Sequence, residues 1–411
     1  MTAIVLRADT RCLPLPDASV DLIVTSPPYF GLRSYTDGGE HYDGQIGSEA
    51  TPREWVDAMV ECTQEWARVL KPTGSMFVNL GDKYAGVSNG SYAHRNASRD
   101  RNHTISRSSL GHGIPQKSLM GLPWRYALSC IDDLGLILRA EIVWSKPNGL
   151  PESVTDRVRR SHEQWFHLTK EPRYFSAVDE IREQHTGNSH GSGNGASRAW
   201  LPSSGGTNHR ALDTDPTEYN PLGKLPGSVW TVPTEPLTVP AHLGVDHFAA
   251  FPTAWPKRLI QGWSPSGVCV ACGEGRRPTI DKGFALDHVQ ARKRPGFIDA
   301  TEPNGNLRGM NAAVRPNGST IATITGYVCA CPDTCAPTRP SVVLDPFGGT
   351  GTTALVASAL GRTGISVDLS HDYSRLAMWR TRDRAQLAKI LEVAKPPTET
   401  VGQEAMFGGV A

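Results

Sequence analysis

The feature that most constrains the fold of this chain is an apolar run that leads directly into a cluster of glycines. Val342-Val343-Leu344-Asp345 is followed by Pro346-Phe347-Gly348-Gly349-Thr350-Gly351, and a helical pattern extends from Thr352 to about Leu360. A buried strand, a sharp turn and a helix form the first half of a βαβ unit, and glycine permits the turn. A second apolar run at 364–367 completes the unit, so the sequence predicts a parallel sheet covered by helices.

The same glycine turn predicts a ligand site. Glycines let a ligand approach the backbone, and the first turn of the helix offers free N–H groups. Asp368 closes the second strand and can accept hydrogen bonds from ribose hydroxyls. Two alternatives stay open: a turn that binds nothing, and the G-x-G-x-x-A turn of a nicotinamide or flavin oxidoreductase. A Walker-type phosphate loop is not expected, because no lysine precedes Thr352 or Thr353.

A second turn carries candidate catalytic residues. Residues 20–25 read as a buried strand that ends at Ser26-Pro27-Pro28-Tyr29. The prolines stiffen this turn, and parallel sheets bind ligands at the carboxyl ends of their strands. The Ser26 hydroxyl and the Pro27 carbonyl can accept hydrogen bonds from an aromatic amine and aim its lone pair at a methyl donor. Tyr29 can stack on a base. Taken alone, these residues also fit a diproline turn that only ends a strand.

The two turns together resemble one known family, the amino-methyltransferases of DNA, which use S-adenosylmethionine. The catalytic turn comes first and the cofactor turn last, which is similar to the β class of that family. Asp9 stands where the family has an acidic residue that holds the cofactor adenine, although Ala8 replaces the usual glycine. Residues 228–252, with Phe251 and Pro252, resemble the segment that leads into the cofactor site, and residues 144–157 resemble a loop on the target-base side.

The resemblance implies a fold, a reaction and a set of site residues. The fold is a mostly parallel, seven-stranded α/β sheet, circularly permuted relative to other methyltransferases. The reaction is site-specific methylation of an exocyclic amine on a base flipped out of double-stranded DNA. Serine in the catalytic turn favours cytosine N4, with adenine N6 as the alternative. The implied cofactor residues are Asp9, Phe251, Pro252, Asp345, Pro346, Phe347, Gly348, Gly349, Gly351, Thr352 and Asp368.

Five cysteines fall in one segment that has little apolar periodicity. Cys269-x2-Cys272 has the spacing of a metal-binding knuckle, and Cys329, Cys331 and Cys335 offer the second half. We expect a structural zinc ion held by Cys269, Cys272, Cys329 and Cys331, the last two chosen because similar family members carry Cys-x-Cys there. Reduced free thiols are the alternative, and Cys335 could take the place of Cys329 or Cys331.

These expectations divide the chain into segments. Residues 1–263 form the N-terminal part of the methyltransferase domain, with flexible insertions at 86–118 and 183–226. Residues 264–340 form a cysteine-rich, zinc-ribbon-like insertion. Residues 341–394 form the C-terminal part with the cofactor turn, and residues 395–411 a disordered tail. Helices are expected at 52–70 and 119–134, and further strands at 74–80 and 136–144.

Bulk properties bear on location and partners. The formal net charge is +1, so any basic DNA-binding surface must be local. The candidate basic groups are Arg95–Arg107 with Lys117, Arg157–Arg160, and residues 276–294, although each could equally be a solvated loop. The first residues lack a signal peptide and no apolar run is long enough for a membrane span, so a cytoplasmic location is expected. The sequence leaves open a homodimer, a partner endonuclease and the recognition site.

Overall fold

The computed structural model describes residues 2–31, 36–37, 40–41, 44–86, 114–149, 151–184, 220–240, 243–244, 250–286, 318–332 and 336–394. These residues belong to two compact units. The larger unit comprises Met1–Val178, Gly227–Arg277 and Cys329–Ala411. The smaller unit comprises Asp179–Pro226 and Pro278–Val328. Most of the two expected insertions, and the expected tail, lie outside the described residues.

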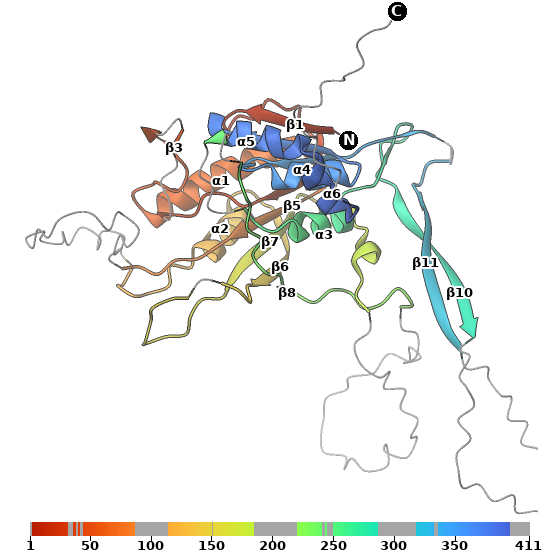
Figure 1. Cartoon of the computed structure of the whole chain (residues 1–411), viewed down its shortest axis with the longest axis horizontal. Coiled ribbons are helices and arrows are strands. Elements are labelled where there is room, and N and C mark those ends of the chain that lie inside the picture. The colour runs from red at the N-terminus through yellow and green to blue at the C-terminus, as the bar shows by residue number, and fades with distance from the viewer. Residues whose placement is uncertain are drawn as a thin grey trace, which may run out of the picture. The chain divides into compact units, whose positions relative to one another are not determined.

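The larger unit is built on one sheet with helices against it (Figure 1). Its strands are β1 (Thr2–Arg7), β2 (Val20–Thr25), β5 (Leu70–Leu80), β6 (Ile137–Ser145), β7 (His162–Thr169), β8 (Val229–Thr231), β13 (Val342–Asp345) and β14 (Thr363–Asp368). Its helices are α1 (Pro52–Val69), α2 (Leu122–Asp132), α3 (Ala254–Trp263), α4 (Thr352–Ala359), α5 (His371–Arg382) and α6 (Arg384–Leu391). Short pairs are β3 (Thr36–Asp37) with β4 (Glu40–His41), and β9 (Val268–Cys269) with β12 (Thr338–Arg339).

The strand order in the sheet is β1-β14-β13-β2-β5-β7-β6-β8. Every neighbouring pair is parallel except the two that involve β7. The expected count of seven strands was therefore wrong, because β8 adds an eighth strand of only three residues, too short to leave a periodic signal. The two ends of the chain meet within the sheet, since β13 and β14 lie between β1 and β2. This arrangement agrees with the expected permuted order.

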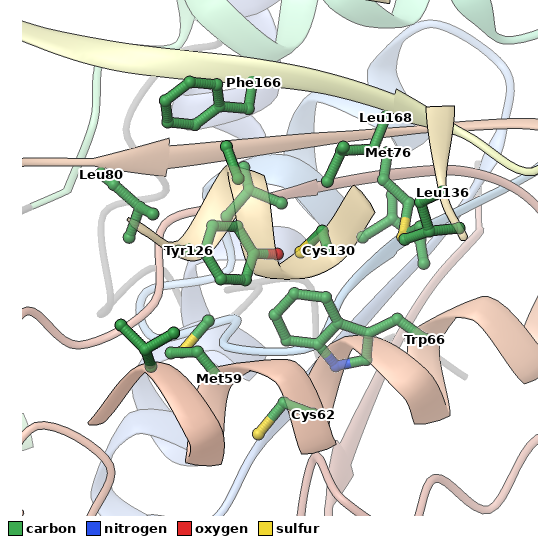
Figure 2. Packing of buried hydrophobic residues seen from close by; sticks show 14 of the residues in the cluster. Met59, Cys62, Trp66, Met76, Leu80, Tyr126, Cys130, Leu136, Phe166 and Leu168 are labelled. Carbon is green, nitrogen blue, oxygen red and sulfur yellow. The ribbon is translucent and has the colours of Figure 1, made fainter. Parts of the chain in front are cut away.

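The sheet separates two apolar cores, and neighbouring residues of one strand point into different cores. In β2, Ile23 joins the core under α1 and α2, whereas Leu22 and Val24 join the core under α3, α4 and α6. Figure 2 shows the first core, where Trp66 of α1 and Tyr126 of α2 pack against residues of β5 and β7. This two-sided burial explains why the central strands are continuous apolar runs.

Helix α1 begins where its sequence dictates. Thr51 accepts a hydrogen bond from the Glu54 N–H, and the Glu54 carboxylate accepts one from the Thr51 N–H, which is a complete capping box. Pro52 occupies the first helical position, where a missing N–H costs nothing. The buried face of the helix carries Trp55 and Trp66, which fixes the helix against the sheet.

The smaller unit contains most of a 3-10 turn, Val178–Ile181, and most of a hairpin of β10 (Arg277–Leu286) and β11 (Gly318–Val328); Val178 and Arg277, where the turn and β10 begin, belong to the larger unit. Within it, Arg182 pairs with Asp179 and donates to the Gly223 carbonyl. The segment expected as one insertion, 264–340, thus contributes residues to both units.

Candidate active site

The Ser26–Tyr29 turn lies at the carboxyl end of β2, between the ends of β13 and β5. Helix α1 supports the turn, because the Trp55 indole donates a hydrogen bond to the Pro28 carbonyl at 3.1 Å. Pro27 is buried, whereas Ser26 and Tyr29 are partly exposed. A Cβ atom added to Gly81 would lie 2.8 Å from the Tyr29 ring, so glycine there makes room for the ring. The turn is therefore both supported and accessible.

A polar network lies behind this turn. The Tyr29 hydroxyl lies 2.9 Å from Asn79 Oδ1 and 2.9 Å from Glu163 Oε2, and the Ser26 hydroxyl lies 3.3 Å from Asn79 Oδ1. Glu163 also pairs with Lys146, whose ammonium lies 4.0 Å from the Trp144 ring centroid. The sequence analysis did not single out Asn79, Glu163 or Lys146. They come from the ends of β5, β7 and β6, and only the pairing of these strands brings them together.

The glycine turn shows which of its residues face outward. Phe347 and Gly349 are partly exposed, whereas Pro346, Gly348 and Gly351 are buried. A Cβ atom on Gly348 would lie 1.9 Å from Ser366 Oγ, and one on Gly351 would lie 3.0 Å from the Ala377 Cβ. These glycines are required by close packing from behind.

Gly349 differs from the other two glycines. A Cβ atom on Gly349 would meet only the Phe347 carbonyl oxygen, at 3.9 Å, so the space above this residue is open. Gly349 and Gly351 both have positive φ angles, 48° and 72°, which favour glycine. The turn therefore presents an open backbone surface at Gly349 that a ligand can approach.

Asp345 lies inside the turn and is only 1% exposed. Its carboxylate accepts hydrogen bonds from the Phe347 N–H at 3.2 Å and from the Thr353 hydroxyl at 2.9 Å. Burial raises the pKa of Asp345 to about 7, against the lowering effect of these bonds. The structure thus places this predicted cofactor residue where its carboxylate shapes the turn.

Asp368 and Asp9 lie on the accessible side of the sheet edge. Asp368 accepts hydrogen bonds from the Gly349 and Ser370 N–H groups, both at 2.9 Å. Asp9 follows β1, whose last residue, Arg7, is in register with Asp368. Arg11 donates to the Asp9 carboxylate and lowers its pKa. The structure therefore brings both predicted acidic residues to the neighbouring ends of β14 and β1.

Helix α5 supports the glycine turn through a buried arginine. Arg380, 3% exposed, donates to the hydroxyls of Thr350 and Thr352 at 2.7 and 2.6 Å. Burial lowers the pKa of Arg380 to about 10. Arg380 and Phe251 both line a cavity of about 120 Å³, and Pro252 beside Phe251 is buried. Arg380, which no motif in the sequence had indicated, thus bonds to the predicted residue Thr352 and lines the same cavity as the predicted residue Phe251.

Three of the predicted metal ligands come together. The sulfur atoms of Cys269, Cys272 and Cys329 all lie within 4.8 Å of one another, and Cys331 is not part of this group. The Cys272 N–H donates to Cys269 and lowers the pKa of that thiol to about 7. Gly273, with a φ angle of 75°, forms the turn of the knuckle. Cys335 lies outside the described residues.

The basic residues near the predicted base-side loop already have partners. Arg157 stacks on Tyr84, with its guanidinium carbon 3.7 Å from the ring centroid, and pairs with Glu152 at 2.7 Å. Arg160 lies 3.6 Å from the Asp82 carboxylate. These contacts tie the segment to Tyr84 and Asp82, which follow β5. Arg95–Arg107 lie outside the described residues.

Comparison with known proteins gives the class and then the family. A family model described as DNA methylase matches residues 20–271 and 336–378, which include both turns. The chain is 36% identical over 288 residues to the Type II methyltransferase M.Cfr9I of Citrobacter freundii, covering 69% of this chain and 81% of the relative. It is 28% identical over 361 residues to M.SmaI of Serratia marcescens, covering 88% and 83%.

A solved structure supports the fold. The PvuII DNA methyltransferase, cytosine-N4-specific, superposes with a TM-score of 0.50 at 16% identity, covering 95% of this chain and 91% of that one. The protein is a methyltransferase. It belongs to the S-adenosylmethionine-dependent DNA amino-methyltransferase family, which sets aside the oxidoreductase alternative. Within the described residues, no helix combines the length and apolarity needed to cross a bilayer.

Proposed function

We propose that the protein transfers a methyl group to the N4 amino group of cytosine in double-stranded DNA, with adenine N6 as the alternative acceptor. The observation that carries this proposal is the position of Ser26. Its hydroxyl lies at the end of β2, and β2 pairs with β13, the strand that leads into the open glycine turn. An amine held at Ser26 and a methyl donor held over Gly349 would therefore be neighbours.

The residues at the glycine turn fit the methyl donor. The adenosine part would lie between Phe347 and Gly349, which are the partly exposed positions of the turn. Asp368 and Asp9 can accept hydrogen bonds from the ribose hydroxyls and the adenine amino group, respectively. Bound S-adenosylmethionine supplies an electrophilic methyl group on its sulfonium centre.

The residues of the catalytic turn prepare the amine. An aromatic amine is a weak nucleophile, because its lone pair is delocalised into the ring. Ser26 Oγ and the Pro27 carbonyl accept its two hydrogens and hold the nitrogen so that its lone pair points at the donor. Tyr29 packs against the flipped base, which leaves the duplex at a cost of a few kcal/mol. As the nitrogen forms its bond to the methyl carbon, the methyl–sulfur bond of the donor would break and a neutral thioether would leave. The nitrogen would then give up one of these hydrogens as a proton to water.

The direct test is the product. The protein is expressed in cells that lack other DNA methylation, and the nucleosides of their DNA are separated by mass spectrometry. N4-methylcytosine is expected. N6-methyladenine would keep the mechanism and overturn the assignment of the base. Unmodified DNA from cells that contain folded protein able to bind S-adenosylmethionine would overturn the substrate class. Ser26→Ala should slow methyl transfer at least tenfold and leave the affinity for S-adenosylmethionine within about threefold, because its hydroxyl faces the base.

We also propose that a zinc ion is held by Cys269, Cys272, Cys329 and Cys331. Support comes from the three sulfur atoms within 4.8 Å of one another. Tetrahedral zinc with sulfur ligands at about 2.3 Å requires sulfur atoms about 3.8 Å apart. The cysteines join the chain before β10 to the chain after β11, so zinc would act as a structural clasp.

Metal analysis tests the zinc proposal. Protein purified without chelator should contain about one zinc ion per chain, and Cys272→Ser should lose it. Zinc-free protein in reducing buffer would contradict the proposal. Cys331→Ser and Cys335→Ser then decide the fourth ligand: loss of zinc only in Cys335→Ser would show that Cys331 was the wrong choice.

A further inference from the structure

We propose that Asn79 is a positioning residue that fixes the hydroxyl hydrogen of Ser26 and thereby turns the oxygen lone pairs of Ser26 toward the substrate amine. The inference rests on the proposed function, because it takes Ser26 as an acceptor for that amine. Asn79 lies at the end of β5 and is 1% exposed. Its role would be to act through Ser26, without touching the base.

The orientation of the Asn79 amide follows from its partners. Asn79 Nδ2 donates to the Gln164 carbonyl at 3.1 Å. A backbone carbonyl can only accept, so the atom that faces it must be the amide nitrogen. The amide oxygen is then directed at the hydroxyls of Ser26 and Tyr29, at 3.3 and 2.9 Å. The antiparallel pairing of β5 with β7 thus fixes an acceptor beneath the catalytic serine.

The Tyr29 hydroxyl has one hydrogen and three oxygens within reach: Glu163 Oε2 and Asn79 Oδ1, both at 2.9 Å, and Ser26 Oγ at 3.4 Å. Glu163 is the strongest acceptor, because it is a carboxylate, and Lys146 holds it in place. Asn79 Oδ1 has two lone pairs, so it can accept from Ser26 whether the tyrosine hydrogen points at Glu163 or at Asn79 itself. The ion pair of Glu163 and Lys146 thus holds the second acceptor of the Tyr29 hydroxyl in place.

The direction of the serine hydrogen matters for the reaction. A serine hydroxyl has one hydrogen and two lone pairs, and it rotates to suit its neighbours. When the hydrogen points at Asn79 Oδ1, the lone pairs are available to the amine. Without Asn79, the nearest remaining acceptor for this hydrogen is the more distant Tyr29 hydroxyl, at 3.4 Å. The serine would then present its hydrogen to the amine part of the time, and two donors would face each other.

A double-mutant cycle tests the inference, with the single-turnover rate of methyl transfer to DNA as the readout. Asn79→Leu removes the acceptor at nearly constant volume. It should slow transfer about tenfold when Ser26 is present, and less than about twofold in the Ser26→Ala background. The affinity for S-adenosylmethionine, measured by calorimetry, should stay within about threefold in every variant.

Two further variants complete the experiment. Ser75→Ala is the control. It removes the buried hydrogen bond between Ser75 of β5 and His167 of β7, which joins the same two strands at the end of β5 away from Asn79. It should lower the melting temperature and leave the rate unchanged. Asn79→Asp keeps an oxygen facing Ser26, so its rate should exceed that of Asn79→Leu. If Asn79→Leu fails to fold, Asn79→Asp decides: a rate as low as that of Ser26→Ala would overturn the inference.

The outcomes separate this inference from the proposed function. An equal loss from Asn79→Leu with and without Ser26 would overturn the positioning role and leave the methyltransferase assignment intact. A wild-type protein that binds S-adenosylmethionine and methylates no DNA would overturn the proposed function itself.

Discussion

Asp345 was expected to contact the cofactor, but its buried carboxylate stabilises the glycine turn through hydrogen bonds. The sequence places this aspartate at the end of a strand, next to the cofactor turn, and the structure buries its carboxylate against the Phe347 N–H and the Thr353 hydroxyl. Burial raises its pKa from an ordinary value of 3.8 to about 7. The folded protein therefore holds a proton that the unfolded chain has lost in the interval between these values.

This shift predicts a pH dependence of stability. Below pH 3.8, Asp345 is protonated in both states. As the pH rises toward about 7, only the unfolded state ionises freely, so stability falls, and the loss is complete above that pH. Asp345→Asn, which does not titrate, should flatten this decline by on the order of a few kcal/mol. Urea denaturation at pH 5 and pH 8 measures the free energy of unfolding of both proteins. If the free energy of unfolding falls by the same amount between pH 5 and pH 8 in wild type and variant, Asp345 is not the cause of the decline.

Residue by residue, the sequence predicted the parts of the site that lie on turns. Ser26–Tyr29 and Phe347–Gly351 are contiguous motifs, so their roles can be argued from local chemistry. Asn79, Glu163 and Arg380 lie within or at the ends of regular elements and carry no local signal. They reach the site only through strand pairing and helix packing, which a single sequence does not specify.

At the scale of elements, the glycine turn is held between two helices. Gly351 precedes α4 with a φ angle of 72°, and Ala377 of α5 packs against it. Arg380, one turn further along α5, bonds to the hydroxyls on both sides of Gly351. Helix α5 thus fixes the shape of the glycine turn, although the turn lies about twenty residues before it in the sequence.

Two glycines allow a matched test of this contact. Gly361 has a φ angle of 78° and no atom within 4 Å of an added Cβ, whereas Gly351 has Ala377 at 3.0 Å. Gly351→Ala and Gly361→Ala should both destabilise the protein by about 1 kcal/mol through backbone strain. Only Gly351→Ala should also weaken S-adenosylmethionine binding, by about tenfold or more, as measured by calorimetry. Similar affinities for the two variants would contradict the clamping role of α5.

Element boundaries were predictable where the apolar pattern was strong. The helix expected at 52–70 is α1, Pro52–Val69, and the strand expected at 136–144 is β6, Ile137–Ser145. β5 begins at Leu70, earlier than the expected residue 74, because Lys71-Pro72 was taken as a break. β7 was missed, because His167 interrupts its apolar run. Burial lowers the pKa of His167 to about 3, and the neutral ring bonds to Ser75.

At the scale of the whole molecule, the central strands come from opposite ends of the chain. β13 lies between β14 and β2, and β14 pairs with β1 along six residues from Thr2↔Thr363 to Arg7↔Asp368. The large unit is therefore closed by contacts between residues far apart in sequence. Such contacts hold the two ends together independently of the segment that joins them.

A chain cut between β10 and β11 should therefore stay assembled. A protease site inserted between residues 287 and 317 would give two fragments, which should co-purify under native conditions and separate in denaturant. Methylation activity should remain within a few-fold of that of the uncut enzyme. Separation of the fragments in native buffer would show that sheet pairing alone does not hold the unit together.

The position of β13 also has a consequence for synthesis in the cell. The ribosome completes the serine turn early, but the strand that lies beside it and the glycine turn that follows emerge much later. Until then the sheet lacks the neighbour of β2, and the incomplete chain has the turn proposed to hold the base without the turn proposed to hold the methyl donor. A chain terminated before β13 would therefore lack the glycine turn and, under the proposed function, would transfer no methyl group to DNA.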